Sequence, residues 1–168
     1  PANWSNVNLN SNGTVNTGGA PANIIMTSGN NNGGNPGSTN YAITVGCAGN
    51  VTFNWNYSSP DPFGSVFDYP RYSINGAPAS TFSAFMIGGS NIQTGSQTIA
   101  LNAGDILELQ AYTIDNDPSV ATITISSFAA PAGPISGTVS YWDAAVGGNN
   151  VGAPPITVTP GAAGTLTY

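Results

Sequence analysis

Apolar and polar residues alternate with a period of two along several short stretches of the chain. In residues 51–57, VTFNWNY, every second residue is Val, Phe, Trp or Tyr, and the residues between them are polar. The same alternation recurs over 106–114 and 119–128. A period of two is typical of a half-buried β-strand. The aromatic side carries too much area to be left in water, so we expect it to face a core.

Residues that favour turns separate these stretches. The pattern predicts one or two strands within 1–20 and further strands at 21–27, 40–46, 51–57, 66–74, 96–101, 106–114 and 119–128. Residues 28–39, rich in Gly, Asn and Pro, predict a loop, and Pro70 predicts an edge position or a bulge. About eight or nine short strands without helical periodicity indicate an all-β fold, an antiparallel β-sandwich or jelly roll.

A change in composition predicts a module boundary near residue 131. Residues 129–134, AAPAGP, form a linker of small residues and Pro between a unit at 1–131 and a remainder at 132–168. The remainder predicts three strands, at 137–142, 155–159 and 164–168, which are too few for an independent sandwich. We therefore expect an incomplete second module that continues into a longer protein or pairs with another chain.

Charge is scarce and excludes several classes of function. The 168 residues carry a net charge of −6, with one Lys or Arg in total and no His. Binding to nucleic acid or to an anionic membrane needs a cluster of positive charges, and Arg71 is the one cationic side chain in the sequence, so we expect neither function. No apolar run approaches the ~20 residues of a spanning helix. The chain begins on Pro1 without a signal peptide, so we expect a processed or excised piece. We expect the lone Cys47 either to be buried as a small hydrophobic residue or to form a disulfide with a cysteine outside this piece.

The usual catalytic residue types are nearly absent. No base accompanies the many Ser and Thr hydroxyls, and one Cys without His excludes zinc and iron sites in practice. Paired carboxylates of a glycoside hydrolase would need two acids across a cleft, whereas the acids here lie in turns. The sequence therefore predicts a protein that is not an enzyme.

Four of the seven acidic residues fall in two stretches, 54–76 and 113–118. Asp61, Asp68, Asp115 and Asn116 offer the oxygen ligands that Ca²⁺ prefers, with Asp117 beside them. Two alternatives remain open. Asp and Asn often occupy turns because their side chains bond the local backbone. Arg71 also lies close to Asp68 in sequence, where it would neutralise that carboxylate in place of a metal.

Residues 1–131 resemble the CUB-like jelly-roll modules of large secreted bacterial surface proteins. The resemblance rests on separated motifs: Phe53, Trp55, Tyr57, Asp61, Asp68, Tyr72, Asn75-Gly76, AGD at 103–105, Asp115-Asn116 and ISSF at 125–128. It implies that Asp61, Asp68 and Asp115, assisted by Asn116, hold a Ca²⁺ ion that helps bind a basic side chain of a partner. The chain departs from animal CUB domains in lacking their disulfide cysteines.

The tail resembles the opening strands of immunoglobulin-like modules repeated in adhesins of gliding and biofilm-forming Bacteroidetes. The matching segments are ITVTP at 156–160 and TLTY at 165–168. This resemblance implies a multidomain protein that is secreted to the bacterial cell surface.

We therefore expect a non-enzymatic, adhesin-like or filament-forming surface module. Its partners would be neighbouring β-modules of the same long chain, identical subunits or surface polysaccharide. One alternative is a carbohydrate-binding module attached to a secreted hydrolase, with Trp4, Tyr69, Tyr141 and Trp142 as a platform that stacks on sugars, unless these aromatics pack in the core or between modules. Another is a fibre subunit completed by strand addition from a neighbour.

Overall fold

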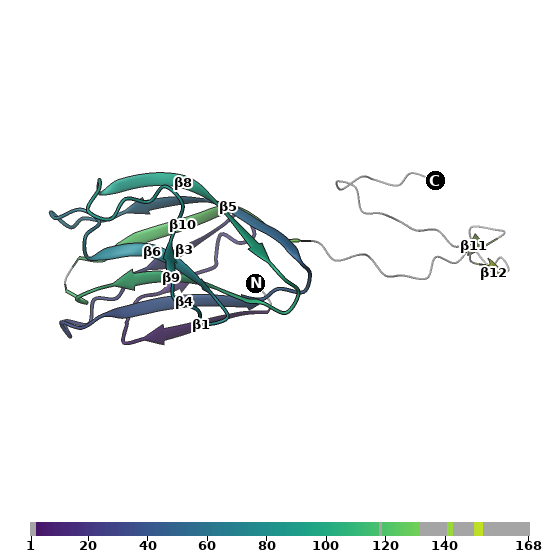
Figure 1. Ribbon diagram of the computed structural model, residues 1–168, viewed down its shortest axis with the longest axis horizontal. Helices are drawn as coiled ribbons and strands as arrows, with labels where there is room; N and C mark the ends of the chain where they lie inside the picture. The colour runs from purple at the N-terminus through teal and green to yellow at the C-terminus, as the bar shows by residue number, and fades with distance from the viewer. Residues whose placement is uncertain (1–2, 118, 132–140, 143–149, 153–168) are drawn as a thin grey trace. The chain divides into compact units, whose positions relative to one another are not determined.

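Two antiparallel sheets of five strands each form the first part of the chain (Figure 1). The structure is a computed structural model and describes residues 3–117, 119–131, 141–142 and 150–152. The chain divides into two compact units, Pro1–Pro131 and Ala132–Tyr168. In the part of the chain that the structure describes, no helix has the length and apolar character that crossing a membrane would need.

The chain crosses between the two sheets repeatedly, with β2–β3 and β6–β7 as pairs of consecutive strands within one sheet. Sheet A has the spatial order β1 (Trp4–Leu9), β4 (Gly37–Thr44), β9 (Ile106–Thr113), β6 (Asp68–Ile74) and β7 (Ser80–Thr81). Sheet B has the order β2 (Val15–Asn16), β3 (Asn23–Thr27), β10 (Thr122–Ala129), β5 (Gly49–Ser58) and β8 (Ile92–Leu101). The predicted all-β antiparallel sandwich is therefore confirmed.

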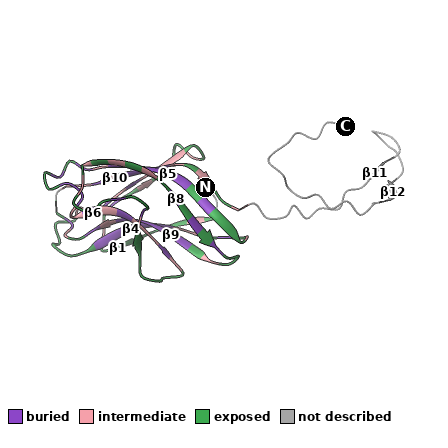
Figure 2. Cartoon of the chain, turned by 45° about the horizontal axis from the view of Figure 1, so that its top comes forward, coloured by how far each residue is buried: buried purple, intermediate pink, exposed green. Residues whose placement is uncertain are grey.

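The core lies between the two sheets and follows the alternation in the sequence. Along β5 the side chains of Val51, Phe53, Trp55 and Tyr57 are buried, while the residues between them are exposed. β9 and β10 alternate in the same way, and Figure 2 shows buried and exposed residues interleaved along the strands. Burial of this apolar area is the main driving force for closing the two sheets on each other.

Some boundaries differ from those expected from the sequence. β4 begins at Gly37, inside the stretch predicted as loop, and β8 begins at Ile92 rather than at residue 96. Pro70 is not in an edge strand, because β6 has β7 beside it. However, β7 pairs only with Arg71 and Tyr72, so Pro70 has no strand partner on that side. This arrangement tolerates the missing N–H group of proline.

The second unit contains β11 (Tyr141–Trp142) and β12 (Asn150–Gly152), which pair antiparallel. The strands predicted at 155–159 and 164–168 lie outside the described residues. The identification of 132–168 as the start of an immunoglobulin-like module stays a prediction.

Candidate functional site

The structure brings the two acidic stretches together at one end of the sandwich. The loop between β5 and β6 meets the loop between β9 and β10 around a cleft of about 280 Å³. Its lining residues are Asp61, Pro62, Phe63, Phe67, Asp115, Asp117 and Ser119. We call Asp61, Asp68, Asp115, Asn116 and Asp117 the acidic loop cluster.

Two carboxylates of the acidic loop cluster are already used in local turns. Asp61 Oδ1 accepts a hydrogen bond of 2.7 Å from the Phe63 backbone N–H. Asp115 Oδ1 accepts bonds of 3.3 Å from the Thr113 hydroxyl and from the Asp117 backbone N–H. These bonds are what the alternative explanation, turn formation by Asp, predicts for both residues.

Asp68 lies beneath the cleft and does not line it. Its side chain is 2% exposed, and its Oδ1 has no hydrogen-bond partner. The pKa of Asp68 is raised to about 6, chiefly by burial and to a smaller extent by the nearby Asp115 and Asp61 carboxylates, against the opposing effect of the Ser28 and Thr113 hydroxyls. Because Asp68 does not reach the cleft, it is badly placed to exchange a proton with a substrate there.

Asn116 hydrogen-bonds its own loop to two segments that are distant in sequence, one at Asn10 and one at 32–35. Its Nδ2 donates bonds of 2.8 Å to the backbone oxygens of Asn10 and Asn35, and its backbone oxygen accepts a bond of 2.9 Å from Asn32. Its backbone N–H donates to Thr113 Oγ1 at 3.0 Å. Sequence reasoning missed this structural role, because no local pattern points to such distant partners.

The fit of this end of the sandwich to Ca²⁺ is partial. The buried oxygens Asp68 Oδ1 and Asn116 Oδ1 lack partners, and a hard cation would supply one. Within the described residues, however, no three His, Cys, Asp or Glu side chains are grouped so that they could hold one metal ion. The assignment of Ca²⁺ to Asp61, Asp68, Asp115 and Asn116 stays a prediction.

Arg71 points away from the acidic loop cluster, on the opposite side of β6 from Asp68. Its Nε donates a hydrogen bond to Gln110 Oε1, and its guanidinium carbon lies 3.5 Å from the centre of the Tyr112 ring. Gln110 pairs with Arg71 across the strands, whereas Asp68 pairs with the fully buried Thr113. Arg71 therefore contacts Gln110 and Tyr112 and does not neutralise the Asp68 carboxylate.

Arg71 belongs to a cluster of side chains on the outward side of sheet A, which are half-buried except for the buried Gln110. We call it the tyrosine–arginine face, and its members are Tyr69, Arg71, Glu108, Gln110 and Tyr112. The Tyr69 and Tyr112 rings lie 5.1 Å apart at 60°. Gln110 Nε2 donates to Glu108 Oε1, so Gln110 joins the cation to the carboxylate.

The alternation over 106–114 predicts that Glu108, Gln110 and Tyr112 share one side of a strand. The structure has them on one side of β9. What the sequence did not indicate is the register that sets Tyr69 opposite Tyr112 and Arg71 opposite Gln110. Among the members of the predicted sugar-stacking platform whose side chains the structure describes, Tyr69 lies on this face.

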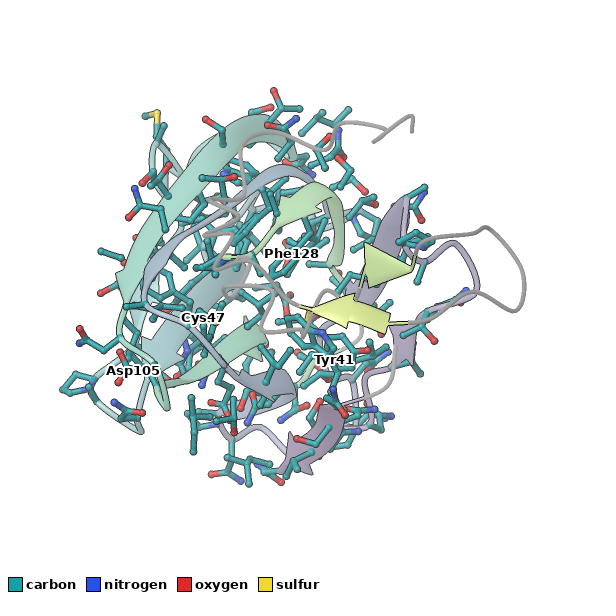
Figure 3. All side chains as sticks on the ribbon, turned by 90° about the vertical axis from the view of Figure 1, so that its right-hand side faces the viewer. Tyr41, Cys47, Asp105 and Phe128 are labelled. Atoms are coloured by element: carbon teal, nitrogen blue, oxygen red, sulfur yellow. The ribbon has the colours of Figure 1, made fainter. Side chains whose placement is uncertain are left out.

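The other described member of that platform, Trp4, packs between the two sheets. Its ring stacks on Tyr41 at 4.5 Å and meets the edge of Phe128 at 5.4 Å. Tyr41 comes from sheet A and Phe128 from sheet B, and both are labelled in Figure 3. They line a mostly apolar pocket of about 180 Å³, smaller than is usual for a ligand site. The side chains of Tyr141 and Trp142 lie outside the described residues.

No family model matches the chain, and no curated protein matches it. Several solved β-sandwich structures are distantly similar. A family 35 carbohydrate-binding module from Clostridium thermocellum is 17% identical, with a TM-score of 0.39, over 71% of this chain and 90% of that one. A family 35 module from Cellvibrio japonicus is 19% identical, with a TM-score of 0.37, over 76% of this chain and 99% of that one.

A third similar structure is the C-terminal family 6 carbohydrate-binding module of a laminarinase from Zobellia galactanivorans. It is 17% identical, with a TM-score of 0.33, over 73% of this chain and 100% of that one. Similarity at this level goes no further than the β-sandwich architecture. Any statement about a ligand has to come from the side chains of this chain.

Proposed function

We propose that the first unit is a non-catalytic binding module that holds a glycan on the tyrosine–arginine face. The observation that carries the proposal is the arrangement of Arg71, which stacks on Tyr112 and is joined through Gln110 to Glu108. This arrangement places ring surface, hydrogen-bond donors and acceptors side by side on the open side of a sheet. Sugars offer the complementary groups, C–H surfaces and hydroxyls.

The face is organised before any ligand arrives. Stacking on Tyr112 and the bond to Gln110 restrict the long Arg71 side chain, and Ser73 Oγ donates to Glu108 Oε1 at 3.3 Å. Side chains that are already ordered lose less conformational entropy on binding. Burial raises the pKa of Tyr69 above its ordinary value. The protonated Tyr69 hydroxyl can donate a hydrogen bond to a sugar.

An unpaired amide beside the face adds support. Asn40 is the cross-strand neighbour of Gln110 in β4 and is 1% exposed. Neither Nδ2 nor Oδ1 of Asn40 has a hydrogen-bond partner. Buried side-chain amides are seldom left unpaired. These two unpaired atoms lie next to Gln110, on the same side of sheet A as the tyrosine–arginine face.

The charges favour a neutral glycan over an anionic one. Arg71 and Glu108 offset each other on the face, and the chain as a whole carries a net charge of −6. A uronate-rich or sulfated polymer would therefore be repelled at long range. The class of ligand that fits these charges is a neutral polysaccharide.

This proposal follows the alternative drawn from the sequence, a carbohydrate-binding module. Whether the parent protein also carries a hydrolase stays a prediction. So do adhesion, filament assembly and a secreted, cell-surface location. A module that holds a neutral polysaccharide would suit either setting.

The test is a binding assay of the wild-type chain against soluble neutral polysaccharides, by affinity electrophoresis and then by calorimetry. We expect Tyr112→Ala to weaken binding at least about fivefold, because loss of one well-placed aromatic side chain typically costs more than about 1 kcal/mol. Arg71→Ala should weaken it as well.

The matched control is Asn56→Ala. Asn56 is exposed on β5, in the other sheet, and its replacement should leave binding unchanged. A folded wild-type chain that binds no neutral polysaccharide, or a Tyr112→Ala variant that binds as the wild type does, would contradict the proposal.

A further inference from the structure

β8 has an open edge along its whole length. It is the outermost strand of sheet B and pairs with β5 over all ten of its residues. Within the described residues, no strand other than β5 pairs with β8, although the Ile92 N–H donates to the Ser90 hydroxyl at 3.2 Å and the Thr98 oxygen accepts from Gln97 Nε2 at 3.1 Å. Figure 1 shows β8 along the upper margin of the sandwich. Most of the N–H and C=O groups on the outer side of the strand are therefore open to pairing with another strand.

This edge lacks the features that usually prevent strand pairing. Residues 92–101, IQTGSQTIAL, contain no charged residue and no proline, and their register with β5 has no bulge. Edge strands are normally kept apart by such residues or by shortness. The other edge strands follow that rule better, since β2 and β7 have two residues each and β1 has six.

Exposed apolar side chains flank the start of β8. Ile92 and Met86 are each 68% exposed, and Ile87 is 52% exposed. Gln93 fixes the segment before the strand, because its Oε1 accepts from the Met86 N–H at 2.9 Å and its Nε2 donates to the Met86 oxygen at 3.0 Å. Apolar groups held in place beside an open edge indicate an interface.

The outward side chains of β8 fit a second copy of the same strand. Thr94, Ser96 and Thr98 are exposed and share one side. When two copies run antiparallel about Ser96, each Thr94 lies opposite Thr98 of the partner subunit, and Ser96 lies opposite itself. Hydroxyl pairs of this kind stabilise antiparallel strands. In the same register Ile92 lies opposite Ala100 of the partner subunit.

We propose that two copies of this chain associate through β8, antiparallel and centred on Ser96, so that their B sheets join. A neutral edge suits this partner, because a chain with a net charge of −6 repels its own copies elsewhere on the surface. The inference is independent of the glycan proposal. In the dimer each copy keeps its tyrosine–arginine face, which lies on the other sheet.

Sedimentation equilibrium of the full 168-residue chain over a wide concentration range tests the association. The wild type should be a dimer in reversible equilibrium. Ser96→Lys places two like charges opposite each other at the centre and should abolish the dimer at concentrations where the wild type is fully dimeric. Asn54→Lys is the matched control. Asn54 is the exposed cross-strand neighbour of Ser96 in β5, away from the edge, so this variant should stay dimeric.

A pair of double variants tests the register. Thr94→Glu/Thr98→Lys sets opposite charges across the interface and should remain dimeric, more so at low salt, whereas Thr94→Lys/Thr98→Lys should be monomeric. Circular dichroism checks that every variant is folded. A wild type that is monomeric throughout, a Ser96→Lys variant that dimerises like the wild type, or two double variants that behave alike would each overturn the proposal.

Discussion

At the scale of single residues, the most unusual group is the Asp68 carboxyl, buried without a partner for its Oδ1. Its pKa of about 6 in the folded chain lies above the ordinary value of 3.8. The folded state therefore holds the Asp68 proton at pH values where the unfolded chain has already released it. The stability linked to Asp68 is fully present below pH 3.8 and is lost as the pH rises through about 6.

Asp68→Asn should remove this loss. We expect the variant to be more stable than the wild type at pH 7.5, by an amount on the order of 2–3 kcal/mol, and the difference to shrink towards pH 4. The measurement is urea unfolding at several pH values with a chelator present. Asp117→Asn is the control, because Asp117 is exposed. An equal slope of stability against pH in Asp68→Asn and wild type would contradict this explanation.

The positions of the acidic residues at the cleft could be predicted from the sequence only in part. The resemblance to CUB-like modules, in which acids of two loops share one end of the sandwich, predicts that Asp61 and Asp68 meet Asp115 and Asn116, and the structure places Asp61 and Asp115 around one cleft. Burial of Asn116 under two distant loops was not foreseen. Its partners Asn10 and Asn35 are contributed by parts of the chain that only the folded sheets bring together.

At the scale of elements, alternation predicted the strands that have one buried and one exposed side. β5, β9 and β10 follow their sequence pattern closely, because the core selects every second side chain. The first half of β8 was missed, since Ile92 points outward and Gly95 occupies an inward position. There the buried side chain comes from the neighbouring strand, a contact that local sequence does not report.

Gly95 leaves room for the Trp55 ring. A Cβ atom at position 95 would lie 2.6 Å from Trp55 Cζ2, well inside contact distance. Gly95→Ala should therefore destabilise the fold by about 1–3 kcal/mol, as overpacking of a core does. Trp55→Phe in the Gly95→Ala background should recover part of the loss, because the smaller ring avoids the clash. Urea unfolding measures both, and a Gly95→Ala variant as stable as the wild type would refute the explanation.

At the scale of the whole molecule, the acidic loop cluster joins two segments that are about 50 residues apart in sequence and belong to different inter-strand connections, so an ion there would stabilise the global fold. If Ca²⁺ binds as the sequence predicts, the melting temperature at pH 7.5 should be higher in millimolar Ca²⁺ than in chelator, because a ligand of the folded state alone stabilises it. Asp115→Ala should remove the difference. Equal melting temperatures for the wild type in both buffers would exclude the ion.

The central claim is that a neutral glycan binds on the outward side of sheet A. The most direct measurement is NMR of the isotope-labelled chain titrated with a soluble neutral oligosaccharide that the binding assay selects. We expect the largest amide and side-chain shifts at Tyr69, Arg71, Gln110 and Tyr112, with the Arg71 Nε–H signal among them. Shifts confined to the acidic loop cluster or to the pocket around Trp4, with the tyrosine–arginine face unchanged, would contradict the claim.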